Sequence, residues 1–89
     1  MAHFKFQWDA SPTPEVDYYR LYEDGELVVD NIGVLNFDLL LDSKPEGSYD
    51  YYVTAVDAES SAESVPSNTV TGNFIMPKAP TNLRVSFVA

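Results

Sequence analysis

The sequence predicts an all-β protein, an antiparallel β-sandwich of about seven short strands. Apolar and polar residues alternate in short runs, which is the period of a half-buried strand. Clusters of Gly, Pro, Asn and Asp separate these runs at intervals of about 8–12 residues, as in sandwiches. No long window shows helical periodicity. The chain of 89 residues allows one small domain, and its hydrophobic content of 45% is enough for a thin core.

The first strands follow directly from this alternation. In the first one Phe4, Phe6 and Trp8 share a face, and in the second Tyr19 and Leu21 do. A hairpin signal at Gly25 leads to a short edge strand, because glycine tolerates positive φ in tight turns. The expected strands are 3–8, 16–22, 27–29, 35–41, 48–58, 67–74 and 83–87.

The later strands alternate in the same way. In 35–41 the apolar face consists of Leu35, Phe37, Leu39 and Leu41. The clearest strand is 48–58, whose expected inward residues are Tyr49, Tyr51, Val53 and Ala55. Its expected outward residues are Asp50, Tyr52, Thr54 and Val56. Residues 57–66 are expected to be a polar loop, and Pro77 and Pro80 bracket a linker before the last strand.

Several motifs occur in the order found in one family. They are Trp8 with Asp9 and Pro12, Tyr19-Arg20-Leu21-Tyr22, Asp24-Gly25, Leu41 with Pro45, Gly47 and Tyr49, Tyr51 to Val56, and Pro66 to Val70. Together they resemble strands B, C, F and G and the turns of a fibronectin type III domain, an Ig-like sandwich. The resemblance implies that Tyr49 is the corner tyrosine, whose hydroxyl bonds back to the preceding turn.

One departure from this family concerns strand A. The family opens with a Pro-x-x-Leu-x-Val pattern, which here stands at the other end of the chain, beginning at Pro80. We therefore expect a sandwich body over 1–74 that starts at strand B, and a linker with a strand A-like arm over 75–89. We expect Leu83, Val85 and Phe87 of this arm to insert beside Phe4 and Phe6 of a neighbouring subunit, with Arg84 outward. The competing arrangement is a hairpin against the strand at 67–74 of the same molecule.

Catalysis has little support in the composition. Cysteine is absent, and the only histidine, His3, lies on a polar strand face, so we expect no enzyme and no cofactor. Asp57 and Glu59 are at most a weak calcium site, and solvated acidic loops explain them better. The net charge of −9 argues against nucleic acid and anionic membranes as partners. The start of the chain lacks the order of a secretory signal, and no apolar run approaches the ~20 residues of a membrane span.

An outward tyrosine patch is the other candidate surface. Tyr18, Tyr22 and Tyr52 are expected on the solvent face of the sheet formed by 16–22 and 48–58. Two interpretations stay open, cross-strand stacking and a contact surface for a protein or a host-surface glycan.

Charge is divided unevenly along the chain. All acidic residues lie within 1–63, whereas residues 64–89 carry only Lys78 and Arg84 as charged groups. Opposite charge would orient docking of the arm on an acidic body. A free-standing domain of this kind resembles accessory virion proteins of tailed bacteriophages. The resemblance implies a head-to-tail homo-oligomer, ring or filament, that contacts other virion proteins and is made in the host cytoplasm. The alternative is a fibronectin type III module that binds glycan or protein.

Overall fold

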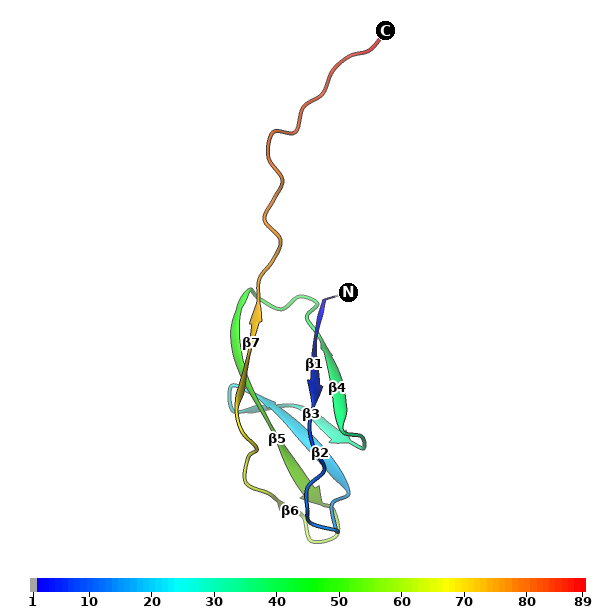
Figure 1. Cartoon of the computed structure of the whole chain (residues 1–89), viewed down its shortest axis with the longest axis vertical. Coiled ribbons are helices and arrows are strands. Elements are labelled where there is room, and N and C mark those ends of the chain that lie inside the picture. The colour runs from blue at the N-terminus through cyan, green and yellow to red at the C-terminus, as the bar shows by residue number, and fades with distance from the viewer. Residues whose placement is uncertain (1) are drawn as a thin grey trace.

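The protein is an all-β antiparallel sandwich, described here from a computed structural model that covers residues 2–89 (Figure 1). No helix occurs in that range. The strands are β1 (His3–Gln7), β2 (Tyr18–Glu23), β3 (Glu26–Ile32), β4 (Asn36–Leu40), β5 (Gly47–Asp57), β6 (Ala62–Glu63) and β7 (Val70–Phe74). The fold class predicted from the sequence is thus confirmed.

Two sheets form the layers. The smaller one pairs β1 with β4, and Phe4 lies opposite Leu39 and Phe6 opposite Phe37. The larger one has the order β3-β2-β5, with β6 and β7 both paired to β5. β7 pairs with the first half of β5, from Gly47 to Tyr51, and β6 pairs with its end. The long strand β5 is therefore the centre of the larger sheet.

Two serines form hydrogen bonds with the edge of β5 in the gap between β6 and β7. Ser64 and Ser67 donate their backbone N–H groups to the carbonyls of Ala55 and Val53, at 2.8 and 2.9 Å. Their hydroxyl oxygens accept the N–H groups of the same two residues, at 2.9 and 3.0 Å. The serine hydroxyls thus accept the β5 N–H groups that the carbonyls of a regular neighbouring strand would accept. No regular strand forms here, in a stretch that includes Pro66, whose nitrogen has no hydrogen to donate.

The core lies between the sheets and is small. Leu21, Ile32 and Tyr51 are buried, and the Phe6 and Tyr51 rings lie 4.8 Å apart across the interior. Partly buried residues from both layers surround them, namely Phe4, Phe6, Trp8, Tyr19, Val29, Phe37, Leu39, Tyr49 and Val53. Most of these residues belong to the inward faces that the alternation predicts, but Leu35, expected on the same face as Phe37 and Leu39, is exposed. Because so few residues are fully buried, each contact between the layers carries a large share of the stability.

The two layers approach each other closely at Gly72. A Cβ atom placed there would come within 2.7 Å of Cε2 of Phe4. The Phe4 ring therefore fills the space that a side chain on β7 would take. Glycine at this position allows β7 to approach β1 closely.

Two local predictions are wrong. Residues 62–63 form β6 inside the segment expected to be a loop, and β3 is longer than the expected 27–29 because its hairpin with β2 continues to Ile32. Residues 83–87, expected to be a strand beside a neighbouring subunit, form none in the single chain, where no strand edge lies beside them.

The outward face of β5 is also less exposed than predicted. Val56 and Thr54 are buried although both were expected to face solvent. Val56 has Tyr18 as its partner on one side and Glu63 on the other, so long side chains flank it on the same face. Thr54 donates its hydroxyl to the Glu63 carboxylate, at 2.6 Å, and is covered by it.

Candidate functional site: an open sheet edge and an extended tail

The outer edge of β1 is open. Within residues 2–89, β1 pairs with β4 alone. The Ala2 carbonyl accepts the Leu41 N–H, and Trp8 N–H donates to the Leu35 carbonyl, so the even-numbered residues direct their backbone groups at β4. Successive residues of a strand alternate in this direction. The backbone groups of Lys5 and Gln7 therefore point to the open side, where a further strand could pair with them.

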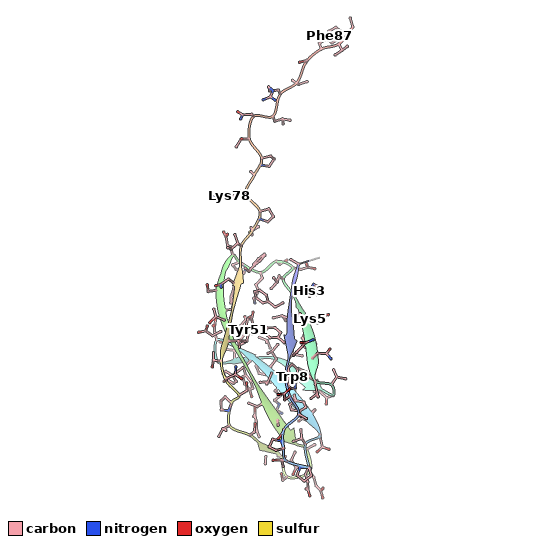
Figure 2. All side chains as sticks on the ribbon, viewed as in Figure 1. His3, Lys5, Trp8, Tyr51, Lys78 and Phe87 are labelled. Atoms are coloured by element: carbon pink, nitrogen blue, oxygen red, sulfur yellow. The ribbon has the colours of Figure 1, made fainter. Side chains whose placement is uncertain are left out.

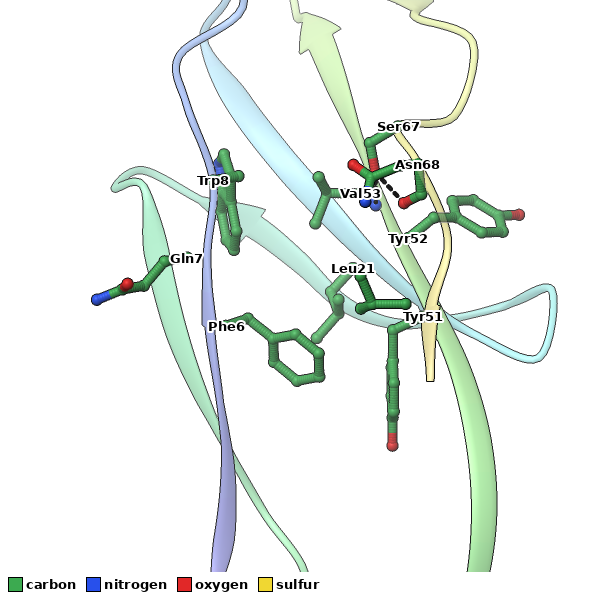
Figure 3. Close-up of a pocket in the computed structure, with 10 residues that line it drawn as sticks. Phe6, Gln7, Trp8, Leu21, Tyr51, Tyr52, Val53, Ser67 and Asn68 are labelled. Carbon is green, nitrogen blue, oxygen red and sulfur yellow. Dashed lines mark hydrogen bonds between the residues drawn. The ribbon is translucent and has the colours of Figure 1, made fainter. Parts of the chain in front are cut away.

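An apolar cleft lies beside this edge. It has a volume of about 90 Å³, and Phe6 of β1 and Trp8, just after β1, face Leu21, Tyr51 and Val53 across it (Figure 3). A second cleft of about 300 Å³ shares Trp8, Val53, Ser67 and Asn68 with the first. The two together form a continuous groove on the open side of the sandwich, which we call the open-edge groove. Its first part is smaller than the ~150 Å³ cavity that holds a benzene molecule, and so it suits a branched aliphatic side chain.

Residues 75–89, called the tail here, extend away from the body formed by residues 2–74 (Figures 1 and 2). None of them belongs to a strand. The exposed fractions of Leu83, Val85 and Phe87 are 99%, 96% and 94%. The radius of gyration is 19.3 Å, whereas a compact chain of this length has ~12 Å. An alternating apolar segment that is this exposed has no packing partner in its own molecule.

The tail continues the direction of β7. Figure 1 shows β7 running toward the pole at which β1 begins, and the tail leaving from that pole along the long axis of the body. β1 runs the opposite way. Pro77 and Pro80 favour extended backbone and oppose a reversal toward the body. Asn82 has a φ of 59°, so the regular extended segment begins at Leu83.

The predicted interface residues are thus in two places. Phe4 and Phe6 lie in the partly buried inner face of β1, and the groove lies beside them. Pro80, Leu83, Arg84, Val85 and Phe87 lie on the exposed tail. The structure of the single chain does not bring the two sets together.

The predicted tyrosine patch lies over β2 and β5 and is held by hydrogen bonds. The rings of Tyr22 and Tyr52 stack, with centroids 4.9 Å apart. Tyr22 donates its hydroxyl to Glu63, and the Arg20 guanidinium lies over the Tyr18 ring. Cross-strand stacking, one of the two interpretations from the sequence, is therefore present.

Glu63 is the centre of this patch and was not singled out from the sequence. It accepts hydrogen bonds from Thr54, Tyr22 and Arg20. The bonds from Thr54 and Tyr22, and then the Arg20 charge, lower the pKa of Glu63 despite partial burial. Arg20 also bonds Asp30, at 2.9 Å, and lowers the pKa of that carboxyl.

A second polar cluster joins β2, β5 and the turn before β5. Tyr51 donates its hydroxyl to Glu23, at 2.7 Å, and Lys44 pairs with the same carboxylate. Burial raises the pKa of Glu23, but the bonds from Lys44 and Tyr51 outweigh it, so the pKa is lowered. Burial, and then the bond to Glu23, raise the pKa of Tyr51. Tyr49 donates its hydroxyl to the Pro45 carbonyl, the bond expected of a corner tyrosine.

Among residues 2–89, no group of three or more His, Cys, Asp or Glu side chains could hold a metal ion. The Asp57 carboxylate accepts hydrogen bonds from Glu59 N–H and the Ser60 hydroxyl, as in a polar turn. In the same range there is no helix that could cross a membrane. No protein-family model, curated protein or solved structure matches the chain.

Proposed function

We propose that this chain is a non-enzymatic structural protein that assembles head to tail by strand donation. The tail of one subunit adds a strand to β1 of the next and fills its open-edge groove. The observation that carries the proposal is the complementarity of two features of one molecule. One is a sheet edge with an apolar cleft beside it, and the other is an exposed, alternating apolar segment that its own body does not bind.

Burial of the tail side chains gives the assembly its driving force. Transfer of Leu83, Val85 and Phe87 from water into the groove is worth ~1.5–3 kcal/mol for each side chain. The sum of these free energies is of the same order as the free-energy cost of losing translational and rotational freedom on association. Backbone hydrogen bonds to Lys5 and Gln7 add to it. We therefore expect assembly to be reversible and to depend on protein concentration.

Charge favours the same contact. The body carries a formal charge of −11 and the tail one of +2 from Lys78 and Arg84. Attraction between the tail and an acidic neighbour speeds encounter, whereas contact between two bodies is repelled. Assembly through the tail is thus favoured over unspecific association of bodies.

The setting that we propose is a bacteriophage virion, as a capsid, tail or fibre component made in the host cytoplasm. The resemblance to fibronectin type III domains supports it, and the Tyr49–Pro45 bond agrees with that resemblance. The setting rests on resemblance alone and is tested separately, by mass spectrometry of purified virions.

Sedimentation velocity over a range of concentrations tests the assembly itself. The full chain should form species larger than the monomer, and the triple variant Leu83→Ser, Val85→Ser, Phe87→Ser should remain monomeric. Val88→Ser is the matched control, because Val88 is also apolar and exposed but alternates to the other face. A full chain that stays monomeric at millimolar concentration, or a triple variant that assembles like the control, would contradict the proposal.

A binding module is the second candidate function, favoured by the Tyr22–Tyr52 stack on the surface of the larger sheet. Such a surface suits a sugar ring or a protein side chain. A glycan array distinguishes the two functions. Reproducible binding that is lost in the variant Tyr22→Ala, Tyr52→Ala, in a chain that stays monomeric, favours the module.

A further inference from the structure

Resting on the proposed strand donation, we infer a specific register and polarity for the donated strand. It runs antiparallel to β1 of the neighbour, with Leu83 opposite Trp8, Val85 opposite Phe6 and Phe87 opposite Phe4. This register builds an open, polar filament in which subunits follow one another along their long axis.

The antiparallel direction follows from the sheets themselves. Every strand pairing in the described chain is antiparallel, including that of β1 with β4. Parallel pairing is less stable for each residue and is found mainly in sheets that are buried on both faces. An added edge strand beside β1 is therefore antiparallel.

The register follows from which side chains share a face. Residues directly opposite each other in an antiparallel pair point to the same side of the sheet. Phe4, Phe6 and Trp8 face the interior, so the apolar tail residues must lie opposite them. Only one antiparallel register places all three apolar tail residues opposite the three aromatic ones. A shift by two residues leaves one of the three beyond the inward face of β1.

The hydrogen bonds of β1 agree with this register. Its even-numbered residues bond β4, so the pairs on the open side that exchange hydrogen bonds are those of Lys5 and Gln7. In the proposed register Lys5 lies opposite Ser86, and Gln7 opposite Arg84. Both tail residues belong to the outward set of the alternation, so neither has to enter the core.

The groove fits the strand at both of its ends. Leu83 and Val85 come to lie beside the cleft lined by Phe6 and Trp8. The preceding part of the tail, with Lys78, then continues past Trp8 along the second cleft, whose lining includes Asp9. Beyond it a third cleft is lined by Glu15, Asp57 and Glu63. The basic end of the tail thus meets the carboxylates of the neighbour.

The shape of the assembly follows from the directions in Figure 1. The tail leaves its body opposite to the direction of β1. An antiparallel partner strand for that tail must itself run in the direction of the donor's own β1. The neighbour therefore has the same orientation as the donor and stands ahead of it on the same axis. Residues 75–82 span at most ~26 Å, from the end of β7 to the position opposite Trp8 of the neighbour.

Reciprocal exchange is excluded by the same geometry. A two-fold axis across the long axis inverts the partner, so a straight tail would run parallel to the partner's β1. A two-fold axis along the long axis places the partner beside the donor, and a straight tail then passes beyond the partner's β1. A small ring would need a sharp bend at the prolines of the linker. The heterologous contact with a straight linker leads instead to an open filament with two different ends.

Engineered cysteines test the register in the full chain, which has no cysteine of its own. The variant Lys5→Cys, Ser86→Cys carries both thiols at exposed positions, as does the control Lys5→Cys, Arg84→Cys. Directly opposite residues lie ~5.5 Å apart at Cα, which allows a disulfide, and diagonal ones lie ~7–8 Å apart. After mild oxidation, we expect the Ser86 variant to be cross-linked severalfold more than the Arg84 control, in a ladder of multimers without a preferred size.

Each other outcome overturns a defined part of the inference. Preferential cross-linking of the Arg84 control means a parallel or shifted strand and refutes the register while strand donation stands. A ladder that ends at the dimer or at one closed size refutes the filament. Disulfides within monomers, with none between separately labelled Lys5→Cys and Ser86→Cys chains, refute strand donation itself and with it the proposed function.

Discussion

Gly72→Ala is the most direct test of how the two layers pack. The added methyl group would lie 2.7 Å from Cε2 and 2.9 Å from Cζ of Phe4, whereas carbon atoms prefer ~3.5–4.0 Å. The Phe4 ring must therefore move by nearly 1 Å. It lies edge-on against Tyr51, with centroids 5.7 Å apart, and against Phe6, at 6.3 Å.

The expected loss of stability follows from this crowding. Overpacking of a core costs ~1–3 kcal/mol, and the smaller entropy of the unfolded alanine chain returns ~0.4–1 kcal/mol. We expect a net loss of about 1–2 kcal/mol in the free energy of unfolding. For a domain of this size, that lowers the Tm by roughly 4–16 °C.

Thermal and urea unfolding followed by circular dichroism measures this change. Gly33→Ala is the matched control, because a Cβ at Gly33 meets nothing within 4 Å. Phe4→Leu in the Gly72→Ala background should recover part of the loss, since the smaller side chain leaves room for the methyl group. If Gly72→Ala is as stable as Gly33→Ala, the close approach of β7 to β1 is wrong.

Three further predictions concern the core, the carboxylates and the groove. Trp8→Ala removes a half-buried ring whose centroid lies 5.7 Å from that of Tyr19, and it should lower the free energy of unfolding by roughly 2–3 kcal/mol in urea titration. The pKa values of Glu23 and Glu63 are lowered in the fold from 4.5. Their stabilisation is thus complete above pH 4.5 and lost as the pH falls through the folded pKa. We expect the Tm to fall on acidification below that pH, and to fall less in Glu63→Gln. A synthetic peptide of residues 78–89 should occupy the groove at the growing end and shorten the assemblies seen by light scattering. The same peptide with serine in place of Leu83, Val85 and Phe87 should leave them unchanged.

Alternation along the chain was enough to predict the inner faces of the sandwich. The period of two placed Phe4, Phe6 and Leu21 on the correct sides, because each of these strands has one buried face. The same pattern gave a wrong prediction for the outward face of β5, where side chains of neighbouring strands bury a residue expected to be exposed. Val56 is covered by Tyr18 and Glu63, and that depends on which strands pair with β5, which a local pattern does not contain.

The polar clusters could not be predicted from local sequence patterns for the same reason. Arg20 and Glu63 are 43 positions apart in the chain and meet only because β2 and β6 flank β5. Lys44 and Glu23 likewise come from separate parts of the chain, the turn before β5 and the end of β2, and pair only in the folded protein. The tail residues could be recognised from their alternation and their Pro-x-x-Leu-x-Val pattern. Their distance from the body, however, is a property of the fold, because it depends on the direction in which β7 ends.

The alignment of the tail with β7 also determines how the molecule bears mechanical load. A pull on the tail acts along β7, at right angles to the hydrogen bonds that join it to β5. The hydrogen bonds between β5 and β7, from the pair Gly47–Phe74 to the pair Tyr51–Val70, are then loaded in shear. These bonds must break together and cannot open one after another. Pulling β7 sideways would instead unzip the same bonds in sequence at a lower force. In the proposed filament, a chain of such subunits would resist stretching far better than peeling.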